Sequence, residues 1–466
     1  MASPHIKDYL HKKIHMIGIG GSSMSGLARM LHEKGYRLTG SDNLETYATK
    51  SLRELGIPVA IGHSEENVRQ ADLIIYTIAI AEDNPERVEA RRLNLPQIER
   101  ATLLGQLMDG YPTAIGVCGT HGKTTTTSMI AQILVEAQTD PTIHIGGSLD
   151  VIGGSVRTGR SDIFLTEACE FNLSFLHLKP TIAVITNIDE DHLDFFRDLD
   201  DIQSAFTSFL SLVPPEGTAI GNGDDPRVTE VFQTLACKIV TYGLSEACDI
   251  RADQIAYDDF GRGSFDVLLQ GKALGHVQMQ IAGPFNVYNA LASAACAHLL
   301  GLDMKIVCEA LFRFHGARRR FELTGVIDGV KLYHDYGHNP EEMRNVLSIA
   351  RLQPHRRLWA VMQPHTYSRV KKMLPQYFTC TQAADITLVT DIYAAREKDP
   401  GDIRAEQIVD GMLSQGLCAV HTPTFDDTEA YLRAHWETGD LVVTMGCGNI
   451  NQLNEQMHAH EESKNQ

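Results

Sequence analysis

The chain has 466 residues, enough for about three domains of ordinary size, each with a sizeable core. Hydrophobic residues make up 43% and charged residues 21% of the sequence, which is near the globular average and excludes collagen-like, disordered and coiled-coil classes. The formal net charge of −18 at pH 7 repels phosphate backbones, so nucleic acid is not expected as a partner.

The nine cysteines are scattered and form no C-x-x-C pair, so the sequence predicts neither a disulfide framework nor a zinc knuckle. The N-terminus lacks an apolar signal segment, and no later stretch approaches the roughly 18 apolar residues that would span a bilayer. We therefore expect a cytoplasmic protein without a membrane partner.

The first part of the chain is expected to form a Rossmann-like domain over residues 1–107. An apolar strand at 14–19 leads into a glycine turn and a helical pattern at 25–34. A strand at 36–40 follows, and residues 71–80 form a near-continuous apolar run typical of a buried parallel strand.

The glycine turn of this part contains Gly18, Gly20 and Gly21 and could bind a diphosphate at the helix N-terminus. Ser23 stands where the dinucleotide fingerprint requires glycine. Asp42 follows Gly20 by 22 residues, near the place of a ribose-binding acid, although acids at strand ends are common. A nicotinamide site and a turn without a ligand both remain open here.

A second strand, glycine turn and helix open the central domain, expected over residues 108–316. The strand at 113–118 runs into G-T-H-G-K-T-T at 119–125, as phosphate binding requires. Backbone N–H groups and the helix N-terminus would face the phosphates, Lys123 would add a point charge, and Thr124 could bind Mg²⁺. The loop is a shortened variant, because Val117 replaces the first Walker glycine; the alternative is a glycine turn with an incidental lysine.

Further α/β alternation is predicted behind this loop, with strands at 162–166 and 181–187, helices at 202–212 and 287–300, and antiparallel strands within 249–281. The run N-I-D-E-D-H-L-D at 187–194 follows a strand end and includes His192. Carboxylates and an imidazole near a nucleotide suit Mg²⁺, and Glu170 is a second candidate ligand. The alternative is a solvated acidic loop.

The third part, expected over residues 317–466, again alternates helices with strands, at 330–334, 358–363, 386–390 and 441–445. The basic run Arg318 to Arg320 could close over phosphates, although charge runs are usually solvated.

Polar runs at 334–340 and 363–369 each follow a strand of this part. His338, His365 and Arg369 would recognise a carboxylate if the fold brings them together, whereas each histidine alone is more often structural. The predicted fold class is α/β, with three α/β domains in series.

Eight ordered motifs together resemble the Mur ligase family of bacterial cell-wall synthesis, over essentially the whole chain. They are G-I-G-G-x-x-M-S-G at 18–26, G-T-H-G-K-T-T at 119–125, E-A-C-E-F-N-L-S-F-L at 167–176, N-I-D-E-D-H-L-D at 187–194, F-N-V-Y-N-A-L-A at 285–292, R-R-F at 319–321, D-Y-G-H at 335–338 and Q-P-H-T-Y-S-R at 363–369.

The resemblance implies an ADP-forming amide ligase of peptidoglycan precursor synthesis, which serves cell shape and division. Its substrates would be ATP, UDP-N-acetylmuramate and L-alanine, and its metal Mg²⁺, or Mn²⁺ in its place. The first domain would bind the UDP part, the central domain ATP, and the third domain would close to admit the amino acid. The chain would be a monomer or a homodimer.

The resemblance also assigns residues by motif position. The residues expected to bind the UDP-sugar are Gly18, Gly20, Gly21, Ser25, Ser41 and Asp42. Those expected to bind ATP are Gly119, Thr120, His121, Gly122, Lys123, Thr124, Thr125, Asn286, Asn289, Arg320 and Asp335. Those expected to form the alanine pocket are Tyr336, His338, His365 and Arg369. Thr124, Glu170 and His192 would hold the metal, and the catalytic set is Lys123, His192, His338 and Arg320, with His192 or His338 as the base.

In this mechanism the lactyl carboxylate attacks the γ-phosphorus of ATP, and the amine of alanine then attacks the acyl phosphate. Cations must neutralise both anions before the acyl phosphate forms. Three positions depart from the family pattern, namely Cys169, His334 and Asn339.

Three alternatives remain. A recycling ligase would attach a tripeptide to the same nucleotide, a non-catalytic sugar-nucleotide sensor would bind without turnover, and a nicotinamide oxidoreductase would rest on the first glycine turn alone.

Overall fold

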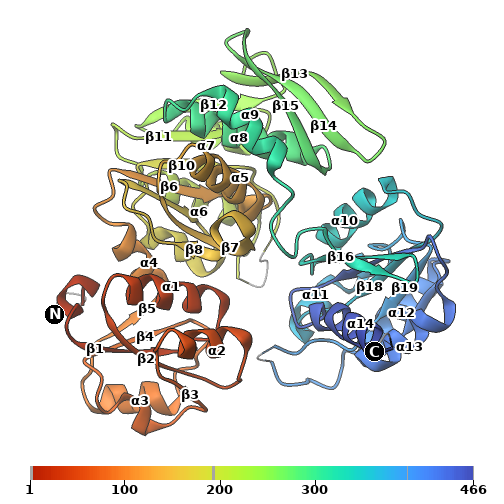
Figure 1. Ribbon diagram of the computed structural model, residues 1–466, viewed down its shortest axis with the longest axis horizontal. Helices are drawn as coiled ribbons and strands as arrows, with labels where there is room; N and C mark the ends of the chain where they lie inside the picture. Colours follow the sequence, from red (N-terminus) through yellow and green to blue (C-terminus); the bar gives the residue numbers. More distant parts are fainter. Residues whose placement is uncertain (1–3, 192–194, 396, 465–466) are drawn as a thin grey trace. The chain divides into compact units, whose positions relative to one another are not determined.

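The structure, a computed structural model, describes residues 4–191, 195–395 and 397–464 (Figure 1). The chain forms two compact units. The first runs to Ile255 and includes Ser264–Gln280 and Phe285–His315, and the second comprises Ala256–Gly263, Ile281–Pro284 and the chain from Gly316 onward. The domain boundaries expected at residues 107 and 316 stay predictions.

The N-terminal sheet of the first unit is parallel throughout, with strand order β3-β2-β1-β4-β5. Its strands are β1 (Lys13–Ile17), β2 (Arg37–Asp42), β3 (Val59–Ile61), β4 (Leu73–Tyr76) and β5 (Gln97–Glu99). Its helices are η1 (Ile6–Tyr9), α1 (Ser22–Glu33), α2 (Tyr47–Glu54), η2 (Glu65–Val68), α3 (Pro85–Arg92) and α4 (Arg100–Met108). Strand order reverses between β1 and β4, so a ligand crevice is expected at their carboxyl ends.

The strand predicted at 71–80 is shorter than its apolar run. It pairs with β5 only from Ile74 to Tyr76, because β5 is three residues long, and Ile78 is 42% exposed. A continuous apolar run therefore overstates a strand whose neighbour ends early.

The central sheet has ten strands in the order β15-β14-β13-β12-β11-β10-β6-β9-β7-β8. Its strands are β6 (Thr113–Cys118), β7 (Thr142–Leu149), β8 (Gly154–Arg157), β9 (Ile163–Glu167), β10 (Ile182–Ile185), β11 (Thr218–Asn222), β12 (Lys238–Gly243), β13 (Ile250–Tyr257), β14 (Arg262–Leu269) and β15 (Lys272–Ala282). Strands β14 and β15 are neighbours joined by Gln270 and Gly271, both at positive φ, so they form the expected antiparallel hairpin.

Helices of the central part include α5 (Lys123–Glu136), η3 (Asp150–Ile152), η4 (Phe171–His177), α6 (Leu199–Leu210), α7 (Pro226–Phe232), α8 (Phe285–Leu299) and α9 (Met304–Arg313). Helix α5 packs against α8 and α9 and is buried from Thr126 to Leu134. The loop at its N-terminus is therefore anchored to a helix that the core surrounds.

The sheet of the second unit has the order β16-β17-β21-β18-β19-β20, parallel except for β16. Its strands are β16 (Glu322–Ile327), β17 (Val330–Asp335), β18 (Leu358–Met362), β19 (Ile386–Val389), β20 (Ala419–His421) and β21 (Leu441–Met445). Its helices are α10 (Pro340–Leu352), α11 (Tyr367–Tyr377), α12 (Ala405–Ser414), α13 (Phe425–His435) and α14 (Asn451–Lys464). The four predicted strands are present, and the two missed ones are the sheet edges, β16 and β20, whose sequences are partly exposed.

The α/β class predicted from the sequence is confirmed in all three sheets (Figure 1). Among the described residues, no helix is both long and apolar enough to cross a membrane.

Candidate active site

The loop between β6 and α5 is held by the chain that follows the neighbouring strand β10. The backbone N–H of Thr120 donates to the carbonyl of Asn187 at 3.0 Å, and the Thr120 hydroxyl accepts from Asp189 N at 2.9 Å. The Asn187 carboxamide completes this pairing, since its Oδ1 accepts from His121 N at 2.8 Å and its Nδ2 donates to His121 O at 3.0 Å. Asn187 thus fixes the middle of the phosphate-type loop from outside.

Both positions in this loop require glycine, because neighbouring atoms leave no room for a Cβ. Gly119 has φ +127°, and a Cβ there would lie 2.0 Å from Thr186 Oγ1. Gly122 has φ +84°, and its Cβ would lie 2.5 Å from Asn289 Oδ1. Val117, which replaces the Walker glycine, is fully buried in β6. The shortened loop is therefore supported by neighbouring segments rather than by extra glycines.

Lys123 and Glu170 form a close pair behind this loop. The ammonium donates to Glu170 Oε1 at 2.8 Å and to the carbonyls of Gly119 and Thr120 at 2.6 and 2.8 Å. Burial lowers the pKa of Lys123, but the Glu170 carboxylate offsets this and the net pKa is raised, so Lys123 stays protonated. The pair offers a cation for a phosphoryl group and a carboxylate for a metal ion.

Two of the three expected metal ligands lie among the described residues, and both offer oxygen atoms that suit Mg²⁺. Thr124 follows Lys123 in the first turn of α5, and its hydroxyl has no hydrogen-bond partner among the described residues. Glu170 adds a carboxylate that is 2% exposed, and hydroxyl and carboxylate oxygens are the ligands that Mg²⁺ prefers. His192, the third expected ligand, lies outside the described residues.

The acidic run beyond Asn187 is partly tied to the loop. Asp189 Oδ2 lies 3.7 Å from His121 Nε2, and a hydrogen bond from His121 lowers the pKa of Asp189. This carboxylate is therefore ionised beside the loop, as an electrostatic partner of a half-buried imidazole.

Asn289 and Asn286 lie on α8, beside the loop. Asn289 is buried, donates from Nδ2 to Asn286 Oδ1 at 2.9 Å and accepts at Oδ1 from the Thr126 hydroxyl at 3.2 Å. It therefore braces the first turns of α5, and its expected contact with adenine stays a prediction.

The glycine turn after β1 is closed by an acidic side chain. Asp42 Oδ2 accepts from Gly20 N at 2.9 Å, and a Cβ on Gly20 would lie 2.8 Å from Thr49 Cγ2. Gly18 has φ +75°, and Gly21 is the N-cap of α1 and makes no side-chain cap. The departure at Ser23 has a structural reason, because its hydroxyl lies 3.0 Å from His144 Nε2.

Two serines expected to bind the sugar nucleotide are bonded within the protein. The Ser25 hydroxyl donates to Ser22 O at 3.1 Å, and Ser41 is fully buried with its hydroxyl donating to Glu86 at 2.6 Å. Their direct contacts with a ligand stay predictions.

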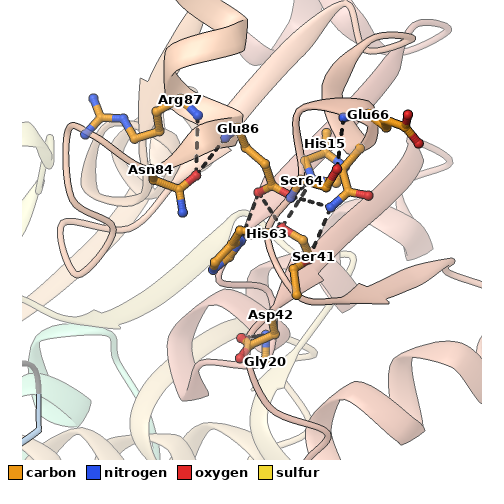
Figure 2. A network of polar contacts seen from close by, with 12 residues as sticks. His15, Gly20, Ser41, Asp42, His63, Ser64, Glu66, Asn84, Glu86 and Arg87 are labelled. Carbon is orange, nitrogen blue, oxygen red and sulfur yellow. Dashed lines mark hydrogen bonds and ion pairs between the residues drawn. The ribbon is translucent and has the colours of Figure 1, made fainter.

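Glu86 is a buried residue that sequence reasoning missed, and it joins several elements beside this turn (Figure 2). Its carboxylate accepts from Ser41 on β2 and from Asn67 Nδ2 at 2.5 Å, and it lies 3.1 Å from His63 Nδ1. Burial raises its pKa, but hydrogen bonds from His15, Ser41 and Asn67 bring the pKa down to about 2. Figure 2 shows Gly20 and Asp42 close to this network, so an ionised carboxylate backs the candidate sugar-nucleotide site.

Three of the four residues expected to form the alanine pocket, Tyr336, His338 and His365, lie close together in the second unit. The rings of Tyr336 and His338 lie 5.7 Å apart, His338 and His365 5.8 Å apart, and His365 and Tyr393 5.8 Å apart. Arg369 stands in the first turn of α11, and its Nη1 is buried without a partner among the described residues. Three strand ends therefore bring these rings together, and Tyr393 is a neighbour that the sequence analysis missed.

One nearby departure from the family pattern, Asn339, has a local explanation. Asn339 is the N-cap of α10, where its Oδ1 accepts from Glu342 N at 2.8 Å and its N–H donates to Glu342 Oε2 at 3.3 Å. Asparagine suits this reciprocal cap. Asp335 holds the backbone N–H groups of Phe321 and Gly337 at 2.7 and 2.6 Å, and its expected contact with ATP stays a prediction.

Comparison with known proteins agrees with this geometry. The family model described as "Mur ligase family, catalytic domain" matches residues 13–112, "Mur ligase middle domain" matches 117–297, and "Mur ligase, glutamate ligase domain" matches 319–448. The chain belongs to the Mur ligase family.

Relatives of this Mur ligase match along nearly its whole length. A protein named UDP-N-acetylmuramate--L-alanine ligase from Caldanaerobacter subterraneus subsp. tengcongensis is 46% identical over 95% of this chain and 96% of its own. One of the same name from Alkaliphilus metalliredigens is 44% identical over 97% of this chain and 98% of its own. The solved UDP-N-acetylmuramate-alanine ligase of Thermotoga maritima aligns with a TM-score of 0.83 at 28% identity, covering 97% of this chain and all of that one.

Proposed function

We propose that this Mur ligase joins L-alanine to the lactyl carboxylate of UDP-N-acetylmuramate, forming UDP-N-acetylmuramoyl-L-alanine, ADP and phosphate. The observation that carries this proposal is the 43–46% identity, over nearly the full length, to relatives named for that ligation. The Lys123–Glu170 pair and the pocket around Arg369 supply the two chemistries that the reaction needs.

The first step is transfer of the γ-phosphoryl group of ATP to the lactyl carboxylate. A carboxylate oxygen attacks the γ-phosphorus, the bond to the β-phosphate oxygen breaks, and ADP leaves. Lys123 would bind the transferred oxygens, and the loop held by Asn187 would orient them. Thr124, Glu170 and His192 would hold Mg²⁺, and the bound cation would supply neutralisation of the phosphate charge.

The second step is attack of the alanine amine on the acyl phosphate, which releases phosphate and forms the amide. Arg369 would hold the alanine carboxylate in its planar fork. His338 Nδ1 lies 3.2 Å from Tyr336 O and 3.3 Å from Glu342 Oε2. Both partners accept hydrogen bonds, so Nδ1 carries a proton, and Nε2 would be the atom that acts as the base.

The test is phosphate release by the purified chain with ATP, Mg²⁺ and UDP-N-acetylmuramate, comparing L-alanine with a tripeptide, other amino acids and no acceptor. Release that depends on L-alanine is expected. Release that depends on the tripeptide would replace the proposal with the recycling ligase, and binding of the nucleotides without release would replace it with the sensor.

A further inference from the structure

His334, one of the departures from the family pattern, makes a specific contact that the proposed function leaves unused. It is the last residue but one of β17 and is 1% exposed. Its Nδ1 lies 3.0 Å from Thr444 Oγ1, and its Nε2 lies 3.2 Å from Arg319 Nε. The imidazole therefore connects the middle of the sheet to the first arginine of the R-R-F motif.

The contacts of His334 indicate which ring nitrogen carries the proton. Arg319 Nε–H can only donate, so His334 Nε2 accepts and the ring proton sits on Nδ1. The Thr444 hydroxyl donates to Tyr333 O at 3.2 Å, so its oxygen accepts from Nδ1. Burial, helped by Arg319, lowers the pKa of His334 to about 4, which agrees with a neutral ring at pH 7. Arg319 is thus held by a group without charge.

Most half-buried arginines of this unit have a carboxylate partner, which Arg319 lacks within the described part of the chain. Of the seven half-buried arginines that the structure describes here, four have a carboxylate within 4.0 Å, namely Arg262, Arg344, Arg357 and Arg433. The three that have none among the described residues are Arg319, Arg320 and Arg369. A half-buried guanidinium that no acid neutralises attracts an anion from outside the chain.

Arg319 also faces the ring cluster of the predicted alanine pocket. Its guanidinium lies 4.9 Å from the centre of the Tyr336 ring, beside that of Arg320 at 5.3 Å. Its Nη2 reaches Gly448 O at 3.4 Å.

Two backbone hydrogen bonds hold Arg319 in this position. Its φ of +65° is uncommon for a residue with a side chain. Its N–H donates to Glu322 Oε2 at 2.7 Å, and its carbonyl accepts from Tyr336 N at 2.8 Å. Contacts on both sides therefore compensate the less favourable conformation.

We propose that Arg319 is a further oxyanion-binding residue of the C-terminal pocket and that His334 is its positioning residue. The imidazole orients the guanidinium and leaves its positive charge available. The inference rests on the proposed function, whose reactants present two oxyanions, the carboxylate of the amino acid and the phosphoryl group in transfer.

The test compares variants of the full chain in alanine-dependent phosphate release. Arg319→Ala is expected to lower kcat/KM about 100-fold, because the variant removes a charged hydrogen-bonding group. His334→Leu, which removes the acceptor, is expected to lower it about 10-fold, whereas His334→Gln, which can accept from Arg319 and donate to Thr444, should stay within about 3-fold. A rise in KM for L-alanine identifies the carboxylate, and a rise in KM for ATP with a fall in kcat identifies the phosphoryl group.

His334→Asp separates orientation from charge. A carboxylate keeps the acceptor but neutralises Arg319, so KM for the anion should rise about 5-fold above that of His334→Gln. Equal values for the two variants would overturn the claim that the neutral ring matters.

Arg344→Gln is the matched control, because Arg344 is half-buried in the same unit and paired with Glu341. It should retain the wild-type rate. Wild-type kcat/KM in Arg319→Ala would overturn the inference, as would a His334→Gln variant that is folded by thermal melting yet as impaired as His334→Leu.

Failure of the proposed function is visible separately, as a wild-type chain that releases no phosphate with any acceptor. In that case calorimetric titration of the same variants with inorganic phosphate decides the inference. Weaker binding in Arg319→Ala and His334→Leu, and not in His334→Gln, supports it, and equal binding in all overturns it.

Discussion

The two glycine turns of the first unit share one local plan and differ in the side chains that close them. Each follows a parallel strand and opens a helix, after β1 in one case and after β6 in the other. In the first turn the amide of Gly20 is taken by the carboxylate of Asp42. In the second the amide of His121 is taken by the neutral Asn187, and Lys123 supplies a cation.

This difference suits the two turns to the two ligands that we propose for them. A turn closed by a carboxylate presents acceptors, which suit hydroxyl groups such as those of a ribose, and a helix N-terminus that suits a diphosphate. A turn with a lysine and a neutral clamp leaves its backbone N–H groups and a cation to face a phosphate, as transfer of a phosphoryl group would require. In both turns the closing side chain comes from a different strand end.

Lys123→Ala should have the largest effect and would test the cationic turn directly. We expect kcat to fall about 1000-fold, because the variant removes the charge that binds the phosphoryl group and leaves the buried Glu170 without its cation. Alanine-dependent phosphate release measures this. Binding of UDP-N-acetylmuramate by calorimetry should be unchanged, and loss of that binding would mean that the two turns are not independent.

A variant of Glu86 would test whether an ionised carboxylate stabilises the region around the first turn. Its pKa of about 2 in the folded chain lies below the ordinary 4.5, so its contribution to stability is complete above pH 4.5 and is lost as pH falls toward 2. The contribution is on the order of 3 kcal/mol.

We therefore expect Glu86→Gln to lower the free energy of unfolding at pH 7 by up to that amount, with the gap between variant and wild type closing in acid. Urea unfolding of both proteins between pH 7 and pH 3 measures the gap. A difference that does not change with pH would show that the network stabilises through packing and not through charge.

Asn187→Ala should affect the second turn alone. Losing both hydrogen bonds to His121 should lower kcat/KM for ATP about 30-fold, since each bond contributes about 1 kcal/mol. Asn187→Asp keeps the acceptor for the N–H but sets a carboxylate against the carbonyl, so it should be no better than alanine. An unchanged KM for ATP in both variants would show that the loop holds its own shape.

Asp42→Ala is the counterpart in the first turn and should have the smallest effect. We expect the affinity for UDP-N-acetylmuramate to fall about 10-fold while KM for ATP stays unchanged. Asp42→Asn keeps an acceptor for Gly20 N without the charge, so calorimetric titration of both variants separates the hydrogen bond from the charge. A larger effect on ATP than on the sugar nucleotide would reverse the assignment of the two turns.

Much of this architecture could be predicted from the order of residues alone. Apolar runs located some strands in each of the three sheets, and the glycines with Lys123 predicted a phosphate-type loop despite Val117. The cap formed by Asn339 and Glu342 could also have been found, because asparagine followed three residues later by glutamate is a local signal. These features depend on residues close together in the chain, where periodicity and backbone preference decide the conformation.

Partners far apart in the chain could not be found in that way. Asn187 closes a loop 66 residues before it, Glu86 contacts Ser41 across 45 residues, and His334 lies between Arg319 and Thr444, 110 residues onward. The order and register of the strands set which ends become neighbours, and each contact follows from that packing. Local sequence thus encodes the turns and strands, whereas the groups that orient and charge the candidate site are selected by long-range pairing that no short pattern contains.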